Sequence, residues 1–323
     1  MAVISPSALD VHAHFLPRSY REALERAGIQ HPDGFPFVPK WSVDSALALM
    51  DEVGIGTALL SISSPGLSFV TDEQRTGLAW AVNEDGADAV RSHPHRLGLL
   101  ASLPLPDVDA ALEEIEHASD VLHADGFVLM TNYDGVYLGD ERLEPVMEEL
   151  NRRGAVVALH PTSPPGAEAV AMGRAYPLIE FIFDTTRTVA NLILTGTLQR
   201  HQDLSVIVPH SGSALPSLAD RLDGFAKIFA RKPLEKIDAY AALARLYYDL
   251  AGTPLPHGLP GLLGIAPAEQ LLYGSDTPFT PPNSIHAAAR ALAETDVLNE
   301  HQKRGMFTDN AQPLFGRLMQ SPA

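Results

Sequence analysis

The chain has 323 residues, of which 46% are apolar, and it carries 23 Lys and Arg against 40 Asp and Glu, for a formal net charge of −17. This length and composition suffice for a large buried core, and the acidic balance excludes nucleic acids and anionic lipid surfaces as expected partners. The absence of cysteine excludes disulfides, thiolate ligands and a thiol nucleophile, so a metal ion would have to bind His and carboxylate side chains.

Short apolar runs rich in Val, Ile, Leu and Tyr recur along the chain, and each is followed by turn residues and a stretch with helical periodicity. Their uniformly apolar character is typical of parallel strands that are covered on both faces. The eight predicted strands span residues 8–14, 57–63, 97–103, 126–131, 155–160, 204–210, 246–251 and 271–276.

Between these strands lie segments whose apolar residues recur at spacings of three and four, as in amphipathic helices. The clearest of them span residues 43–53, 107–122, 143–153 and 215–229. Eight β/α units over about 250 residues or more predict an α/β fold, a closed (β/α)8 TIM barrel, with a doubly wound open sheet as the alternative.

Two segments depart from the repeat. Residues 15–42 contain the run HPDGFPFVP and are too long for a simple loop after the first strand, so we expect a lid-like insertion. Residues 300–319 are expected to form a helical tail on the outside of the barrel. Because the chain has no internal repeat, low-complexity linker or charge block, one domain over residues 1–323 is predicted.

The N-terminal sequence MAVISPSALD lacks a basic region followed by a long apolar core. No later stretch approaches the roughly 20 apolar residues that span a bilayer. These features predict a cytoplasmic protein with no membrane partner.

A His-Ala-His motif ends the first predicted strand. Because alternate residues of a strand point to the same side, His12 and His14 should both project toward the mouth of the barrel. His160, His210 and Asp276 are the last residues of the predicted fifth, sixth and eighth strands. The ends of barrel strands converge on one face, so these five side chains are expected to be neighbours there.

Nitrogen and carboxylate ligands without sulfur suit Zn²⁺, Mn²⁺ or Fe²⁺, and three His plus one Asp leave a position open for water or substrate. The fourth predicted strand, GFVLMT, contains no Lys that could be carbamylated to bridge two ions. One divalent ion is therefore predicted, with Zn²⁺ preferred and Mn²⁺ as the alternative. Asp249, on the seventh strand, and Asp10, deeper on the first, could orient the ligands from behind.

Four segments carry a resemblance to a known family: DVHAHFLP, ALHPT, VPHSG and YGSDTPF. Their order and spacing resemble the amidohydrolase superfamily, and within it the metal-dependent nonoxidative decarboxylases. That branch includes the aminocarboxymuconate semialdehyde, γ-resorcylate and 6-methylsalicylate decarboxylases, and nearly the whole chain is most similar to the last group. The resemblance implies that His12, His14, His160 and Asp276 are metal ligands and that His210 is the catalytic histidine.

The chain departs from two of these groups. The γ-resorcylate type has a Glu in place of His12, so its ligand set cannot be carried over. The semialdehyde decarboxylase type has an Arg on the first barrel helix that holds a substrate carboxylate. The corresponding segment here, VDSALALMDEVG, contains none, which argues against a muconate substrate.

The resemblance implies an enzyme that releases CO2 from a 2-hydroxybenzoate-type acid such as 6-methylsalicylate. The ion would bind the phenolic oxygen and the carboxylate of this acid. A protein acid would protonate the ring carbon that bears the carboxylate, so that loss of CO2 restores aromaticity. Asp276 and His210 are the two candidates for this acid.

Further residues are candidates for substrate contacts. Arg187 and Arg221 could hold a carboxylate, and Phe15, with Trp41 and Phe279, could pack against an aromatic ring. In the semialdehyde decarboxylases the Arg that matches Arg221 reaches into a neighbouring subunit's site. This resemblance implies a homodimer or a higher homo-oligomer.

Two other functions remain open. The same residues could serve a hydrolase of an amide or a lactone, in which the ion activates a bound water and His210 assists its attack. A barrel of this kind could also bind a ligand without converting it, because a fold does not fix a function.

Overall fold

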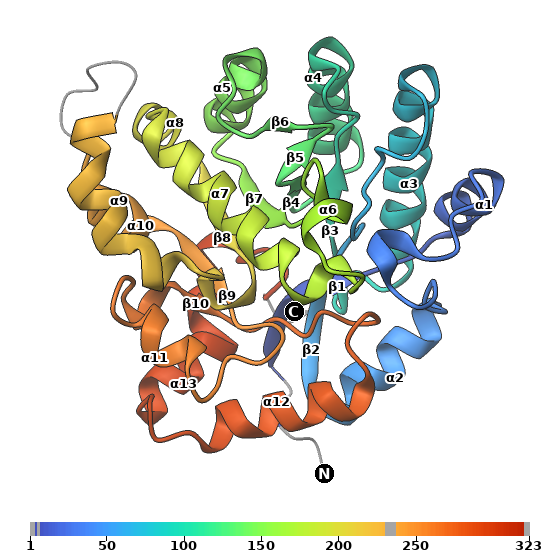
Figure 1. The fold of residues 1–323 in the computed structure, drawn as a ribbon. Helices are drawn as coiled ribbons and strands as arrows, with labels where there is room; N and C mark the ends of the chain where they lie inside the picture. Colours follow the sequence, from blue (N-terminus) through green and yellow to red (C-terminus); the bar gives the residue numbers. More distant parts are fainter. Residues whose placement is uncertain (1–3, 5–6, 230–236, 320–323) are drawn as a thin grey trace.

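The computed structural model describes residue 4, residues 7–229 and residues 237–319. Eight parallel strands form a barrel in the order β1-β2-β3-β4-β7-β8-β9-β10, surrounded by helices (Figure 1). This architecture confirms the predicted (β/α)8 barrel. The barrel strands are β1 (Ala8–His14), β2 (Ile55–Ser61), β3 (Leu97–Ser102), β4 (Gly126–Met130), β7 (Val156–His160), β8 (Ser205–Val208), β9 (Tyr247–Asp249) and β10 (Leu271–Leu272).

The sheet closes between its first and last strands. Two parallel bridges join β1 to the residues just after β10, and the first of them pairs Asp10 with Tyr273. The backbone N–H of Asp276 also donates to the carbonyl oxygen of His12 at 2.8 Å. These contacts exclude the alternative of an open, doubly wound sheet, in which the edge strands stay unpaired.

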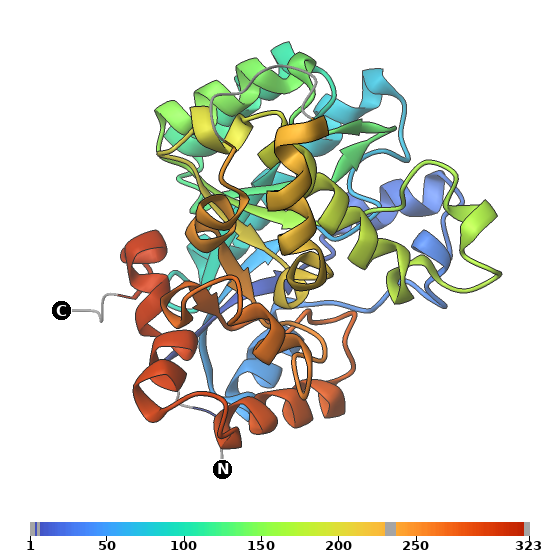
Figure 2. The same cartoon turned by 60° about the vertical axis from the view of Figure 1, so that its left-hand side comes forward.

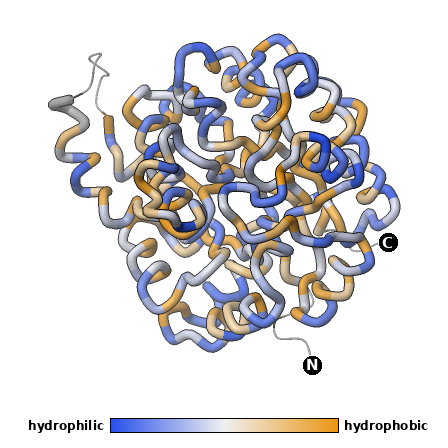
Figure 3. The backbone as a smooth tube through the Cα atoms, turned by 45° about the vertical axis from the view of Figure 1, so that its right-hand side comes forward, coloured by the Kyte–Doolittle hydropathy of each residue, from blue (hydrophilic) through white to orange (hydrophobic). Residues whose placement is uncertain are grey.

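Helices follow the strands around the outside of the barrel, and the second view shows the same arrangement (Figure 2). The α-helices are α1 (Arg18–Arg26), α2 (Val43–Val53), α3 (Asp72–Ser92), α4 (Val108–Glu116), α5 (Glu144–Arg152), α6 (Ala167–Val170), α7 (Glu180–Leu194), α8 (Thr197–Arg200), α9 (Leu215–Phe229), α10 (Ala239–Arg245), α11 (Gly258–Leu262), α12 (Pro282–Glu294), α13 (Glu300–Phe307) and α14 (Gln312–Phe315). Hydrophilic and hydrophobic stretches alternate along the peripheral helices, as expected for amphipathic segments (Figure 3). Within the described residues, no helix combines the length and the apolar character needed to cross a membrane.

Shorter elements occupy the connections. A π-helical turn, η2 (His117–Val121), continues α4, so the helix predicted over residues 107–122 exists with a change of pitch near its end. A small antiparallel hairpin of β5 (Asn132–Tyr133) and β6 (Val136–Tyr137) follows β4. The 3₁₀ turns are η1 (Pro32–Gly34), η3 (Glu141–Leu143), η4 (Tyr176–Leu178), η5 (His210–Gly212), η6 (Ala268–Gln270) and η7 (Asp309–Ala311).

The boundaries of α2 follow from its local sequence. The Ser42 side chain accepts a hydrogen bond from the backbone N–H of Ser45 at 3.1 Å, and the Ser45 side chain accepts one from the N–H of Ser42. Gly54 ends the helix with a φ of 102°, a left-handed conformation that suits glycine, and β2 starts at the next residue. The observed helix has the predicted bounds because both of its ends are marked in the sequence.

Every residue of β1 is buried, and its alternate residues separate into two sets. The residues that belong to the apolar core are Leu9, Val11 and Ala13. The polar set, which is also buried, consists of Asp10, His12 and His14. Because alternate residues of a strand point to opposite sides, the polar set lies on one side of β1, as predicted.

The two predicted strand ends that carry His210 and Asp276 are wrong. The sixth strand was expected to end at His210 and the eighth at Asp276, but β8 ends at Val208 and β10 ends at Leu272. His210 and Asp276 have φ values of 56° and 57°, which lie outside the extended region of the backbone. Both residues therefore belong to the loops after their strands.

The predicted insertion and the predicted tail are both present. The insertion contains α1 and η1, and it lies beside the segment after β7 in both views (Figures 1 and 2), where η1 contacts η4. A Cβ atom on Gly34 would stand 3.2 Å from the Cα of Ala175, which shows how closely the two segments approach. In the tail, α13 packs against β1 and β10 on the outside of the barrel.

Candidate metal centre

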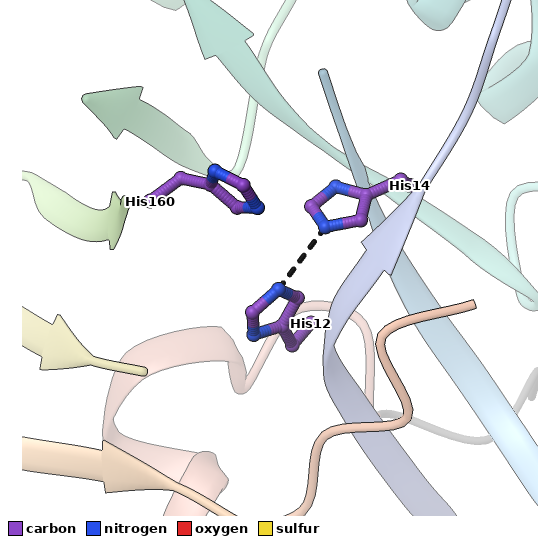
Figure 4. A group of neighbouring side chains, drawn as sticks. All are labelled: His12, His14 and His160. Carbon is purple, nitrogen blue, oxygen red and sulfur yellow. Dashed lines mark hydrogen bonds between the residues drawn. The ribbon is translucent and has the colours of Figure 1, made fainter. Parts of the chain in front are cut away.

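Three buried histidines meet at the C-terminal ends of β1 and β7. His12 and His14 come from β1, and His160 is the last residue of β7. One ring nitrogen of each lies within 4.8 Å of the others, and the Nε2 atoms of His12 and His14 are 3.0 Å apart (Figure 4). Three imidazole nitrogens that converge in this way form a site for a single cation.

The other nitrogen of each ring is engaged by the protein. His12 Nδ1 lies 2.8 Å from a carboxylate oxygen of Asp249, and His14 Nδ1 lies 3.0 Å from the hydroxyl oxygen of Ser61. His160 Nδ1 lies 2.7 Å from the carbonyl oxygen of the following residue. Because each Nδ1 has an acceptor, the proton of a neutral ring stays on Nδ1 and Nε2 is left with a lone pair for a metal ion.

Asp276, in the loop after β10, adds a carboxylate to this cluster. One of its oxygens is 3.3 Å from His14 Nε2 and 3.7 Å from His12 Nε2, and the other is 3.9 Å from His210 Nε2. Burial raises the pKa of Asp276, but hydrogen bonds to His14 and His210 and the charge of His12 outweigh burial and hold this pKa well below its ordinary value. Asp276 is therefore an anionic group beside the imidazole nitrogens of the cluster.

The three histidines differ in their affinity for a proton. Burial lowers the pKa of both His14 and His160, so these rings are neutral. Burial also acts against a charge on His12, but the charge and the hydrogen bond of Asp249 reverse its effect and raise the pKa of His12 to about 9. The protein thus stabilises positive charge at this point, and a divalent ion fits the same nitrogen and carboxylate donors.

Asp249 and Asp10 support the cluster from behind. Besides His12, Asp249 accepts hydrogen bonds from two backbone N–H groups at 3.0 Å, one of them that of His210. Asp10 accepts hydrogen bonds from the backbone N–H groups of His12 and Ser275, also at 3.0 Å. The predicted position of both carboxylates behind the histidines is confirmed.

His210 stands at the edge of the cluster. Its side chain is 17% exposed, and its ring centroid is 5.2 Å from that of His12. His210 and Ser211 both have a φ of 56°, a conformation that costs a non-glycine residue roughly 1–2 kcal/mol. Within the described part of the chain, His210 Nδ1 is buried without a hydrogen-bond partner. The loop thus holds this imidazole at the cluster on a strained backbone.

A cavity of about 510 Å³ opens beside the cluster, and His160, His210 and Asp276 form part of its wall. Three phenylalanines also line it: Phe35, Phe181 and Phe279. The last of these meets the ring of His14 edge to face, with the centroids 5.7 Å apart. The volume and the aromatic wall suit a small aromatic ligand.

The residues described along the cavity wall include no Lys and no Arg. Arg187, on α7, is 51% exposed and pairs with the buried carboxylate of Asp184 at 2.8 Å. Arg221, on α9, is exposed and lies over the ring of Phe225 at 4.9 Å. The structure places neither side chain at the cavity of its own chain, and the role of Arg187 or Arg221 in holding a carboxylate stays a prediction. A contact of Arg221 with a neighbouring subunit stays a prediction.

Phe15 is also absent from the cavity wall. It is only 1% exposed, and its ring packs edge to face on Trp41 with the centroids 5.8 Å apart. On its other side, the ring would lie 3.1 Å from a Cβ atom on Gly86 of α3. Phe15 therefore belongs to the core, and its contact with substrate stays a prediction, whereas Phe279 lies at the cavity.

Several cavity residues were not predicted. Ser63 lies two residues after the end of β2, and its hydroxyl lies 3.4 Å from His160 Nε2, so its place near a strand end could have identified it. Asp33 and Phe35 come from the proline-rich insertion, where no periodicity indicates which side chains turn inward. Phe181 lies in the first turn of α7, where the helical periodicity alone does not show which side chains reach the cavity.

Comparisons with known proteins identify the family. The family described as Amidohydrolase matches residues 9–317. Decarboxylase yanB of Aspergillus niger is 36% identical over 98% of this chain and 89% of its own length. The 6-methylsalicylic acid decarboxylase of Penicillium expansum is 33% identical over 96% of each chain.

Two crystal structures share the fold. The structure of an amidohydrolase II superposes with a TM-score of 0.90 at 38% identity, covering 96% of this chain and 99% of the other. The structure of a dihydroxybenzoic acid decarboxylase from Polaromonas sp. JS666 contains bound manganese and the inhibitor 2-nitroresorcinol. It superposes with a TM-score of 0.83 at 22% identity, covering 97% of this chain and 98% of the other.

Proposed function

The chain belongs to the amidohydrolase family, and we propose that it is a metal-dependent nonoxidative decarboxylase that releases CO2 from a 2-hydroxybenzoate-type acid such as 6-methylsalicylate. The observation that carries this proposal is the convergence of three histidines and Asp276 at the wall of a cavity lined by aromatic rings. Two similar proteins that are named as decarboxylases support the reaction class.

The proposed cofactor is one divalent ion held by His12, His14, His160 and Asp276. Three nitrogens and one carboxylate suit both Zn²⁺ and Mn²⁺, and the manganese in a related crystal structure supports the latter. When bound, the ion would act as a Lewis acid that stabilises negative charge on the substrate oxygens.

The protein's own contribution begins with binding of the ring. Phe35, Phe181 and Phe279 offer aromatic surface on the cavity wall, and the cavity volume accommodates one substituted benzene ring. Because no Arg or Lys is among the described wall residues, the substrate carboxylate finds its positive counterpart at the histidine cluster. Substrate is therefore oriented with its carboxylate toward the histidine cluster, of which His160 lines the cavity.

The protein must also deliver a proton. Loss of CO2 from an unprotonated ring would leave an aryl carbanion, whereas protonation of the ring carbon that bears the carboxylate lets C–C cleavage restore the aromatic ring. His210 and Asp276 both line the cavity, with Nε2 and Oδ2 separated by 3.9 Å. These two side chains are the proposed proton donors, and their proximity allows a proton to pass between them through a small shift.

The test is an assay of CO2 release from salicylate, 6-methylsalicylate and dihydroxybenzoates by the protein loaded with Mn²⁺ or Zn²⁺. A panel of lactones and amides, assayed for ring opening and amide cleavage, runs beside it. We expect CO2 from at least one hydroxybenzoate and no hydrolysis. Hydrolysis without any CO2 would instead establish the hydrolase alternative.

A further inference from the structure

Asp33 brings a carboxylate to the cavity wall from the insertion after β1. It lies in the turn η1, is half-buried and lines the same cavity as His160 and His210. Its φ of 53° is a left-handed conformation that Asp and Asn adopt more readily than other side-chain-bearing residues. The backbone of this turn therefore accepts an Asn or a Gly in place of Asp33.

The position of Asp33 is fixed from two sides. The Ser163 hydroxyl, in the loop after β7, donates a hydrogen bond to one carboxylate oxygen of Asp33. The neighbouring Gly34 packs closely against Ala175, because a Cβ atom there would meet the Cα of Ala175 at 3.2 Å. The carboxylate is thus held at the cavity wall and cannot turn away from a bound ring without breaking these contacts.

The surroundings of Asp33 compensate its negative charge poorly. The described cavity wall has no Lys or Arg, and burial raises the pKa of Asp33 even though hydrogen bonds from Ser163 and Ser64 act to lower it. A second anion brought into this space would be repelled in an environment of low dielectric constant. A methyl or a hydroxyl group on the same ring would meet no such repulsion.

Resting on the proposed function, we infer that Asp33 is a specificity-determining residue: it admits 2-hydroxybenzoates whose other ring substituents are neutral and excludes rings that carry a second carboxylate. Asp33 lies outside the four proposed metal ligands and the two proposed proton donors. Its effect is therefore on the choice of substrate.

The experiment compares 6-methylsalicylate with 2-hydroxyisophthalate and 4-hydroxyisophthalate, which keep the 2-hydroxybenzoate unit and add a second carboxylate. For the full-length, manganese-loaded enzyme, kcat/KM and the dissociation constant are measured for each acid, so that a diacid that binds without turnover is also scored. The readout is the ratio of diacid to monoacid. Asp33→Asn should raise this ratio by about tenfold or more, since it removes one like-charge contact. Asp33→Gly, which the left-handed backbone also accepts, should raise it in the same direction.

Ser163→Ala is the matched control, because it removes one hydroxyl hydrogen bond but keeps the charge, and the carboxylate stays in place through its hydrogen bonds from Ser64 and the Ser163 backbone and through the packing of Gly34. Its ratio should stay within about threefold of the wild type. The inference is overturned if both Asp33 variants leave the ratio within about threefold of the wild type, or if Ser163→Ala raises it as much as Asp33→Asn does.

Failure of the proposed function would look different. It is tested by wild-type CO2 release alone, and a wild type that releases none from any acid refutes it. The ratio of the dissociation constants, measured by calorimetry on the manganese-loaded protein, then decides the role of Asp33. A higher relative affinity of Asp33→Asn for the diacids would support the inference, and an unchanged one would overturn it.

Discussion

Asp249 determines which nitrogen of His12 faces the metal cluster. In Asp249→Asn the amide oxygen can still accept from the backbone N–H of His210, but the amide NH2 then faces His12 Nδ1, where the carboxylate now accepts at 2.8 Å. His12 Nδ1 must become the acceptor, so the proton of the neutral ring moves to Nε2. That nitrogen is the one that faces His14 at 3.0 Å, and a protonated Nε2 cannot bind a metal ion.

The structure sets the size of this effect. The rise of the His12 pKa from 6.5 to about 9 corresponds to roughly 3 kcal/mol in favour of positive charge, and Asp249 is the largest contributor that raises it. Loss of this one carboxylate should therefore cost part of that amount. Changes to residues that orient a metal ligand typically lower metal affinity about 10- to 100-fold, or about 1.4–2.7 kcal/mol, which lies within this limit.

Calorimetric titration of Mn²⁺ and Zn²⁺ into the metal-free protein measures the change. Ser61→Ala is the matched control, because His14 Nδ1 keeps the Ser61 carbonyl oxygen at 3.3 Å as an alternative acceptor. Its affinity should fall by less than about threefold. If Asp249→Asn binds both ions as tightly as the wild type does, the tautomer argument is refuted.

Four further predictions follow from the site and the core. Exhaustive chelation should abolish CO2 release and added Mn²⁺ or Zn²⁺ should restore it, whereas full activity after chelation would contradict a metal-dependent reaction. His210→Asn should retain metal content and lose about 10²- to 10⁴-fold in kcat, and an unchanged kcat would remove His210 from the list of proton donors. Phe15→Ala should lower the free energy of unfolding by about 3–5 kcal/mol in a denaturant titration, because Phe15 is a core residue; a higher KM with unchanged stability would instead make it a substrate contact. Because the folded pKa of His12 is raised to about 9, its protonated ring stabilises the metal-free fold fully below about pH 6.5, and this stabilisation is lost as pH rises toward 9. The melting temperature should fall over that range in the wild type and change less in His12→Asn.

The fold could be predicted because its determinants are local and repeated. Uniformly apolar runs identify parallel strands, and a marked start and end place a helix, as the Ser42 cap and Gly54 do for α2. The positions of His12, His14 and His160 followed from the same rule, since the carboxyl ends of barrel strands share one face.

The parts that could not be predicted depend on backbone conformations and side-chain directions, which the apolar pattern of the sequence does not show. The strands β8 and β10 end before His210 and Asp276, whose φ values are positive, although both residues still reach the cluster. A helix position alone does not show that Arg187 turns to the buried Asp184 instead of the cavity. The insertion has no apolar periodicity, so the sequence does not indicate that the Asp33 side chain contacts Ser163 and faces the cavity.

The closure of the barrel, where β1 meets the residues after β10 and which we call the seam, affects how the protein acquires its ion. His12 and His14 lie on the first strand of the barrel, and Asp276 follows the last one. During synthesis the chain leaves the ribosome from its N-terminus, so the full ligand set exists only after nearly the whole nascent chain has emerged. An ion bound at the seam would link β1 to the loop after β10. Metal binding and completion of the fold would then be a single event.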